Sequence, residues 1–151
     1  MYDTNFVYQG TVTDQSFGGD FKGNPQLTLT VKITHRLRDR FRPRAGVDPV
    51  ETPEEVDVRV NLPTDDAKRL RLNLNDLAAY GFSCTTPEDI DRLDPAHPEA
   101  FLFSGTTVNL APSDKTNKEG APYWNLRVTT RSFNKDKLRE AVASALEPSP
   151  I

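Results

Sequence analysis

Hydrophobic and polar residues alternate along several stretches of the chain, as they do in strands that bury one face. The clearest stretch is residues 26–37, QLTLTVKITHRL, whose apolar positions are Leu27, Leu29, Val31 and Ile33. Residues 54–62 repeat this alternation with three valines and Leu62. Residues 5–17 place Phe6, Tyr8 and Val12 at even spacing, with Gly10 indicating a bulge or bend. These stretches predict three strands.

Residues 101–131 predict a hairpin with a long polar turn. Phe101, Phe103, Val108 and Leu110 alternate with small or polar residues before a turn over 113–120 that closes on Gly120. After the turn, one face carries Tyr123, Asn125 and Arg127, and the other carries Trp124, Leu126 and Val128. The hairpin therefore supplies a fourth and a fifth strand.

Helical spacing of apolar residues occurs in two places. Residues 67–80 carry Leu70, Leu74 and Leu77, with Thr64 as a candidate N-cap and Gly81 as the stop. Leu72 interrupts this stripe, so the segment is one helix or two pieces. A short helix is expected from Thr86, and residues 135–146 form an amphipathic helix with Asn134 as its cap.

This order of elements predicts a mainly β, oligonucleotide-binding-fold-like protein. Three strands, a helical connection and two strands form a five-stranded Greek-key barrel, and a C-terminal helix follows. We expect a barrel over residues 1–133. The helix and short tail over 134–151 would belong to the same domain, with the helix packed on the barrel or used in self-association.

Composition narrows the classes of protein that fit. The 151 residues include one cysteine, Cys84, which excludes an internal disulfide and a multi-cysteine zinc site. The N-terminal residues lack the pattern of a signal peptide, and no apolar stretch approaches the roughly 18 to 20 residues that cross a bilayer. We expect a cytoplasmic protein without membrane association, in the host cytoplasm if it is encoded by a phage.

Charge is sorted into blocks although the net charge is only -3. Residues 32–44 hold Lys32 and five arginines against Asp39, a net +5, whereas residues 45–67 hold seven acids against Arg59, a net -6. Extended backbone would project the five arginines from one side, about 6.6 to 7 Å apart, close to the phosphate spacing of an extended single strand. They form either a phosphate-contacting arm or a solvated loop partly paired with the acidic stretch.

Catalysis finds little support in the sequence. His35 and His97 have no metal-ligand spacing, and nothing near Cys84 activates it as a nucleophile. The acid pairs at 65–66 and 89–91 would suit a magnesium-dependent nuclease, but acids at helix N-termini explain them equally without a metal. We therefore expect no enzymatic activity and no cofactor or metal.

Binding of single-stranded nucleic acid fits the remaining features, because such proteins combine basic grooves with aromatic platforms. The candidate stacking residues are Tyr8, Phe41, Tyr123, Trp124 and Phe133. Trp124 is either a core residue or a stacking platform. Tyr123 shares a polar face with Arg127, which makes it the better candidate for stacking. The candidate phosphate contacts are Lys22, Lys32, Arg36, Arg38, Arg40, Arg42, Arg44, Lys115, Lys118, Arg127 and Arg131.

The layout over residues 5–131, with the pattern GTTVNL…KTNKEGAPYWNLRV, resembles small single-stranded-DNA-binding proteins with the oligonucleotide-binding fold, especially those of phage replication and recombination modules. The resemblance implies protection of single strands, oligomerisation and an acidic tail that recruits replication or recombination proteins. Residues 147–151 contain one acid, which departs from that tail.

The sequence thus predicts a non-catalytic protein that binds single-stranded DNA, or RNA, through an arginine arm and an aromatic sheet face, with homo-oligomerisation open. The alternative is a protein–protein adaptor or structural component whose arginine arm meets an acidic surface on its partner.

Overall fold

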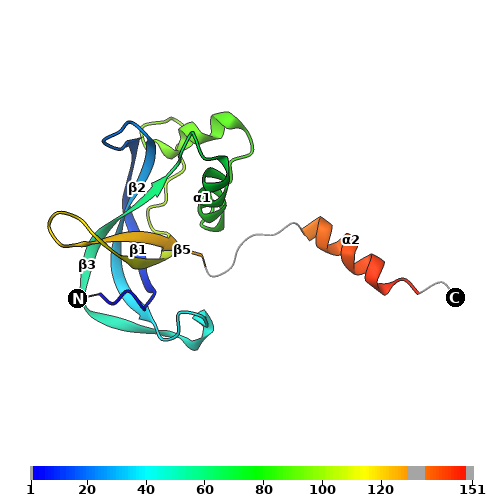
Figure 1. Ribbon diagram of the computed structural model, residues 1–151, viewed down its shortest axis with the longest axis horizontal. Coiled ribbons are helices and arrows are strands. Elements are labelled where there is room, and N and C mark those ends of the chain that lie inside the picture. Colours follow the sequence, from blue (N-terminus) through cyan, green and yellow to red (C-terminus); the bar gives the residue numbers. More distant parts are fainter. Residues whose placement is uncertain (1, 129–134, 149–151) are drawn as a thin grey trace.

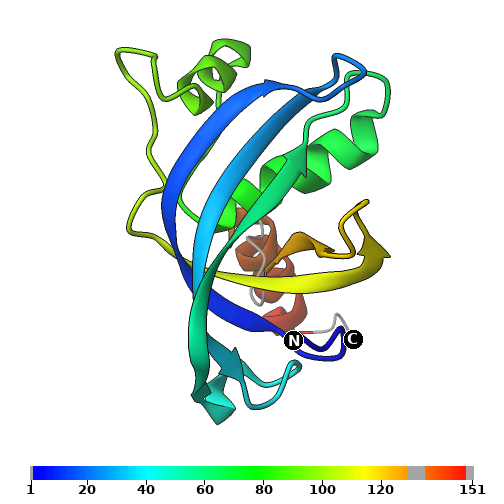
Figure 2. The same ribbon diagram turned by 90° about the vertical axis from the view of Figure 1, so that its left-hand side faces the viewer.

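Five strands close into a barrel in a computed structural model that describes residues 2–128 and 135–148 (Figures 1 and 2). The strand order around the barrel is β1-β2-β3-β5-β4. Neighbouring strands are antiparallel except β3 and β5, which are parallel and are linked through α1 and the segment that follows it. The predicted mainly β, oligonucleotide-binding-fold-like barrel is confirmed. The strands are β1 Tyr8–Gly19, β2 Pro25–Leu37, β3 Val47–Asn61, β4 Thr107–Thr116 and β5 Pro122–Arg127.

The alternating residues face the interior as predicted. The four apolar residues of β2 between Leu27 and Ile33 are fully buried, and Val58, Val108 and Leu110 complete the same core. Gly10 lies at a register shift between β1 and β2, where an added Cβ would be 2.5 Å from the Lys32 carbonyl oxygen. The predicted irregularity at this glycine therefore permits a close approach of two strands.

Two strand boundaries differ from the sequence prediction. β3 begins at Val47 rather than near residue 54, because residues 47–49 pair with the last residues of β2. Phe101 and Phe103 precede β4, and a turn with Gly105 at φ +87° separates them from Thr107. Both rings still pack against Phe82, so their predicted burial is correct although their strand assignment is wrong.

The helical connection is one helix, α1 Ala67–Ala79, and not two pieces. Its cap is Asp66, whose side chain accepts a hydrogen bond from the Arg69 amide, rather than Thr64. Leu77 faces the core, whereas Leu72 is 47% exposed on the opposite side. Two short 3-10 helices follow Arg42 and Thr86, η1 Pro43–Ala45 and η2 Pro87–Leu93, of which only the second was expected.

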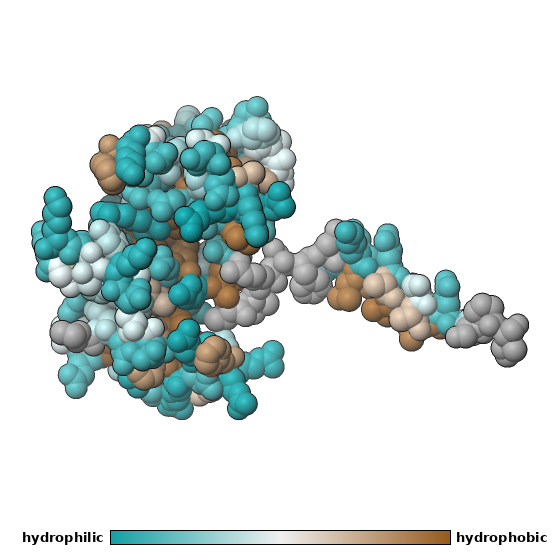
Figure 3. Space-filling view, viewed as in Figure 1, coloured by the Kyte–Doolittle hydropathy of each residue, from teal (hydrophilic) through white to brown (hydrophobic). Residues whose placement is uncertain are grey.

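The C-terminal helix α2, Lys135–Leu146, has the predicted bounds, and its proposed cap Asn134 lies outside the described residues. Every described residue of α2 is exposed, including Leu138, Val142 and Leu146. Figure 3 shows these apolar residues on one side of a helix that lies apart from the barrel. The helix is therefore not packed on the barrel in this structure. Within the described residues, no helix is long and apolar enough to cross a membrane.

Candidate nucleic-acid interface

Two adjoining hollows form one groove on the surface of the barrel, which we call the interface groove. The first hollow lies over the outer face of β3 between the β1–β2 loop and the β4–β5 loop, and the second lies between β3, β5 and α1. They share Arg59, Asn61, Tyr123 and Asn125, so they are continuous.

The β1–β2 loop presents an aromatic ring to solvent at the rim of the groove. The Asp20 carboxylate accepts hydrogen bonds from the Lys22 amide at 2.8 Å and the Asn24 amide at 2.9 Å, and these bonds lower the pKa of Asp20. Gly23, at φ +83°, completes the turn. Phe21 is left 93% exposed beside the Lys22 ammonium, which lies 5.4 Å from the ring centroid.

The β4–β5 loop forms the facing rim and is built in the same way. The Asn117 side chain accepts hydrogen bonds from the amides of Glu119 and Ala121, at 2.9 and 3.0 Å. The predicted polar turn is therefore shorter than expected, because β4 continues to Thr116. Lys118 is exposed near the tip of this loop, and Lys115 lines the second hollow.

Strand β5 divides its side chains between groove and core. Tyr123 is 44% exposed and lines both hollows, and Arg127 lines the second. These two lie on the polar face, as the alternation predicted. Trp124 is 5% exposed and lies in the core, with only an edge at the groove.

The second hollow gathers positive charge from four elements. Its cations are Arg59 of β3, Arg69 of α1, Lys115 of β4 and Arg127 of β5, and the acid among its lining residues is Asp76. The Tyr80 hydroxyl donates to the Arg127 carbonyl and accepts from the Asn109 amide, which fixes β5 against α1. Burial raises the pKa of this Tyr80 phenol.

Three residues of the groove were missed by sequence reasoning: Phe21, Arg59 and Arg69. An aromatic residue inside the glycine-rich turn 18–24, followed by a lysine, was a usable signal for Phe21. Arg59 lies inside the acidic stretch and Arg69 inside a helix, so neither stands out before folding.

The first hollow also contains carboxylates. Asp20, Glu55 and Asp57 line it beside Arg59, and the Asp57 carboxylate accepts a hydrogen bond from the Thr30 hydroxyl at 3.0 Å. Positive charge is therefore concentrated in the second hollow, whereas Phe21 lines the first and Tyr123 lines both.

The predicted extended arginine arm is wrong. Strand β2 ends at Leu37, and residues 38–46 fold into a compact turn, which we call the arginine turn. The Asp39 carboxylate accepts a hydrogen bond from the Phe41 amide at 2.8 Å, and Pro43 begins η1. An Asx turn and a proline thus override the alternation of arginines. Arg38 is paired with Asp48 at 2.9 Å, which fits the alternative of partial pairing with the acidic stretch.

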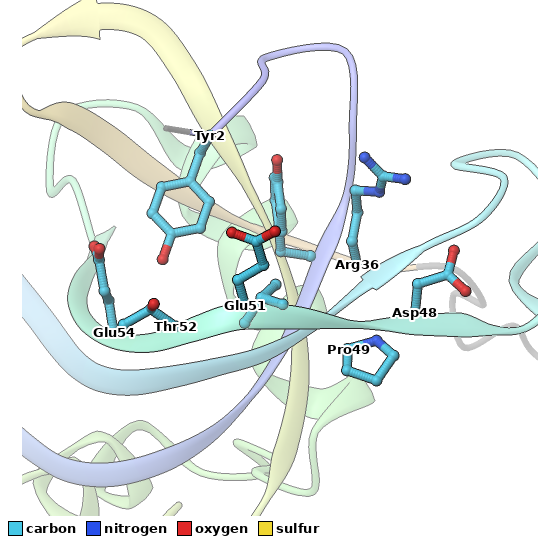
Figure 4. A pocket seen from close by; sticks show the side chains of 9 residues that line it. Tyr2, Arg36, Asp48, Pro49, Glu51, Thr52 and Glu54 are labelled. Carbon is cyan, nitrogen blue, oxygen red and sulfur yellow. The ribbon is translucent and has the colours of Figure 1, made fainter.

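Two further candidates lie away from the interface groove, at the N-terminal segment (Figure 4). The Arg36 guanidinium lies over the Phe6 ring, 4.3 Å from its centroid, and Tyr8 is 5% exposed. Tyr2 covers Tyr8 and Trp124, with ring centroids 5.0 and 4.9 Å away, so stacking of a base on Tyr8 would require Tyr2 to move.

The charged residues of the hollow around Tyr2 are mostly acidic. This hollow, which is separate from the interface groove, is lined by Asp48, Glu51 and Glu54 together with Arg36. Burial, together with the charge of nearby Glu54, raises the pKa of Tyr2 to about 12. A phosphate would be repelled here, so this hollow does not extend the interface groove.

The remaining candidates are scattered. Lys32 is exposed on β2, opposite Glu55 of β3 and outside the groove. Phe41, Arg40, Arg42 and Arg44 belong to the arginine turn and do not line the groove. Arg131 and Phe133 lie outside the described residues.

One acid of each pair weighed for catalysis caps a helix. Asp66 caps α1, and Asp89 accepts hydrogen bonds from the backbone of Thr85 and Thr86, which lower its pKa to about 2. Within the described residues, no three His, Cys, Asp or Glu side chains group so as to hold a metal ion.

No protein-family model matches the chain. A search of curated proteins found no sequence that matches it either.

Proposed function

We propose that the protein binds single-stranded DNA in the interface groove without catalysing a reaction. The observation that carries this proposal is the combination in one groove of two exposed rings, Phe21 and Tyr123, with four cations. Stacking on aromatic rings and neutralisation of phosphates are the two contributions that sequence-tolerant binders use. The barrel supports the proposal by analogy only, since folds of this class carry many functions.

The division of the groove assigns a role to each part. Bases would stack on Phe21 and Tyr123, which line the first hollow. The backbone phosphates would lie toward Arg59, Arg69, Lys115 and Arg127, which line the second. Glu55 and Asp57 in the first hollow would repel phosphates and keep the backbone on the basic side. We extend the proposal to strand protection in DNA replication or recombination, as in the phage proteins that the sequence resembles.

The test is the fluorescence anisotropy of a labelled oligothymidine at low and moderate salt. We expect Tyr123→Ala and Phe21→Ala each to weaken binding by about 10-fold, since one stacking contact contributes about 1–3 kcal/mol. The variant Arg59→Ala/Arg127→Ala should weaken binding and reduce the slope of log K against log salt by roughly 1 to 2.

The matched control is Lys68→Ala/Arg71→Ala, which removes the same charge from exposed positions of α1 outside the groove. This control should bind nearly as the unmodified protein does. Absence of binding by the unmodified protein at low salt, or equal losses in the groove variant and the control, would disprove the proposal.

A further inference from the structure

The arginine turn carries an exposed ring and several cations that the interface groove does not use. Phe41 is 81% exposed, and the Arg40 guanidinium lies 5.0 Å from its ring centroid. Arg40, Arg42 and Arg44 are all exposed, and no carboxylate pairs with them among the described residues. Arg38 is the arginine of this turn that is neutralised, through Asp48.

The turn is ordered by its own backbone, so the cations are presented by a defined structure. The Arg42 amide donates to the Asp39 carbonyl at 3.2 Å, and the Ala45 amide donates to the Arg42 carbonyl at 2.9 Å. The Arg38 amide donates to the Gly46 carbonyl at 3.0 Å and closes the turn. A ring beside three guanidinium groups that have no carboxylate partner among the described residues matches the aromatic and cationic pair found in the groove.

We propose that the arginine turn is a second contact site for single-stranded DNA, separate from the interface groove and reached only by strands long enough to span both. The inference rests on the proposed function of the groove. Phosphates would contact Arg40, Arg42 and Arg44, and Phe41 would stack on a base.

The length of β2 sets the distance between the two sites. Gln26, at the start of β2, lines the groove, and the arginine turn follows Leu37 at its other end (Figure 2). Gln26 and Leu37 are eleven positions apart, and at about 3.3 Å per residue this length of strand spans up to roughly 36 Å. An extended strand that covers about 6 Å per nucleotide needs roughly six nucleotides to bridge this gap, in addition to the roughly four or more that fill the groove, so a strand of about eight that fills the groove does not reach the turn.

The surface between the two sites does not favour a continuous contact. The outward residue Lys32 of β2 lies opposite Glu55 of β3, and Thr30 is bonded to Asp57. Asp14 of β1 lies opposite Thr30 on the other side. Because carboxylates flank this path, the bridging nucleotides would gain little, and affinity should rise in a step once the strand reaches the turn.

The test compares labelled oligothymidines of 8 and 24 nucleotides at low salt. The turn variant is Arg40→Ala/Arg42→Ala/Arg44→Ala, and its charge-matched control is Lys68→Ala/Arg71→Ala/Lys135→Ala, whose residues are exposed and outside both sites. We expect the turn variant to weaken binding of the 24-mer by about 10-fold or more and of the 8-mer by less than about 2-fold. Phe41→Ala, which keeps the charge, should weaken only the 24-mer.

The outcomes separate this inference from the proposed function. If the 8-mer binds and Phe21→Ala weakens that binding, the proposed function of the groove is supported, whatever the result for the turn. Two results would disprove the second site. In one, the turn variant weakens the 24-mer no more than it weakens the 8-mer, or no more than the control variant does. In the other, the turn variant leaves binding of the 24-mer unchanged. Loss of binding to polyglutamate in the turn variant, with the 24-mer unaffected, would assign the turn to an acidic protein surface and overturn the inference.

Discussion

At the scale of single residues, Gln15 connects three segments of the fold. Its side chain is buried, donates to the carbonyls of Leu93 and Phe101 at 3.0 and 2.9 Å, and accepts from the Phe103 amide at 2.8 Å. One glutamine thus provides hydrogen-bond partners for three backbone groups between the end of η2 and the start of β4. These three groups are not paired with a strand.

We predict that Gln15→Ala lowers the free energy of unfolding by about 3 kcal/mol or more, because each buried backbone group left without a partner costs about 1–3 kcal/mol. Gln26→Ala is the control, since the Gln26 side-chain amide bonds to the exposed Asn61 side chain. It should cost less than about 1 kcal/mol. Urea unfolding monitored by circular dichroism measures both, and equal losses would contradict the role of Gln15.

At the scale of elements, the N-terminal segment covers part of the barrel. Tyr2 lies edge-on to Tyr8 and Trp124, and the Asp3 amide donates to the Tyr8 hydroxyl at 3.0 Å. Arg36 holds Phe6, and Arg40 donates to the Asn5 carbonyl at 3.4 Å. The burial of Trp124 therefore depends on a segment outside the strands.

We predict that Tyr2→Ala exposes Trp124, the single tryptophan of the chain. Its fluorescence emission should shift to longer wavelength and its quenching by acrylamide should increase, because the edge contacts of Tyr2 are lost. Thr4→Ala, at an exposed position of the same segment, should leave both unchanged. An unchanged emission maximum in Tyr2→Ala would show that other residues bury the indole.

Some strands could be predicted from the sequence alone and others could not. β2 was predictable because its inward positions from Leu27 to Ile33 are all apolar. Residues 47–53 of β3 lack alternation, and the strand begins at Val47 because residues 47–49 pair with the end of β2. The arginines at alternate positions suggested extended backbone, but the local preferences of Asp39 and Pro43 for a turn prevailed.

The candidate groove was only half predictable. Strand parity identified Tyr123 and Arg127, because both lie on the polar face of one strand. Arg59 and Arg69 approach them only after the chain has crossed from β3 through α1 and returned in β5. The residue pattern within one segment cannot predict that side chains from three separate elements lie in one groove.

At the scale of the whole molecule, the barrel has one weak seam. β3 and β5 pair in parallel at Val58 and Trp124, whereas β1 pairs with β2 along almost its whole length. The Tyr80 hydroxyl, just after α1, bonds to the Arg127 carbonyl of β5 and the Asn109 amide of β4, and so anchors β5 on the side away from this seam. The barrel is therefore expected to open first between β3 and β5.

We predict that amides of β5 exchange with deuterium faster than those in the centre of β2, through an opening that does not unfold the barrel. Tyr80→Phe should accelerate exchange in β5 further, because it removes the bond to Arg127, while exchange in β2 changes little. Native-state hydrogen exchange measured by NMR provides the test. Equal protection of β2 and β5 would mean that the barrel opens only as a whole.

The acidic residues in the first half of β3 also have a consequence for solubility, which requires no ligand. Residues 47–49 and Glu54 pair with β2 on one side, with an irregularity between them, and β3 meets β5 only further along, at Val58. An edge of this kind would recruit strands from other copies of the chain and start aggregation. Pro49 and Pro53 interrupt its amide donors, and Glu51 and Glu54 give it negative charge, whereas Asp48 is paired with Arg38. Two such edges repel each other, so these residues would keep a concentrated protein in solution.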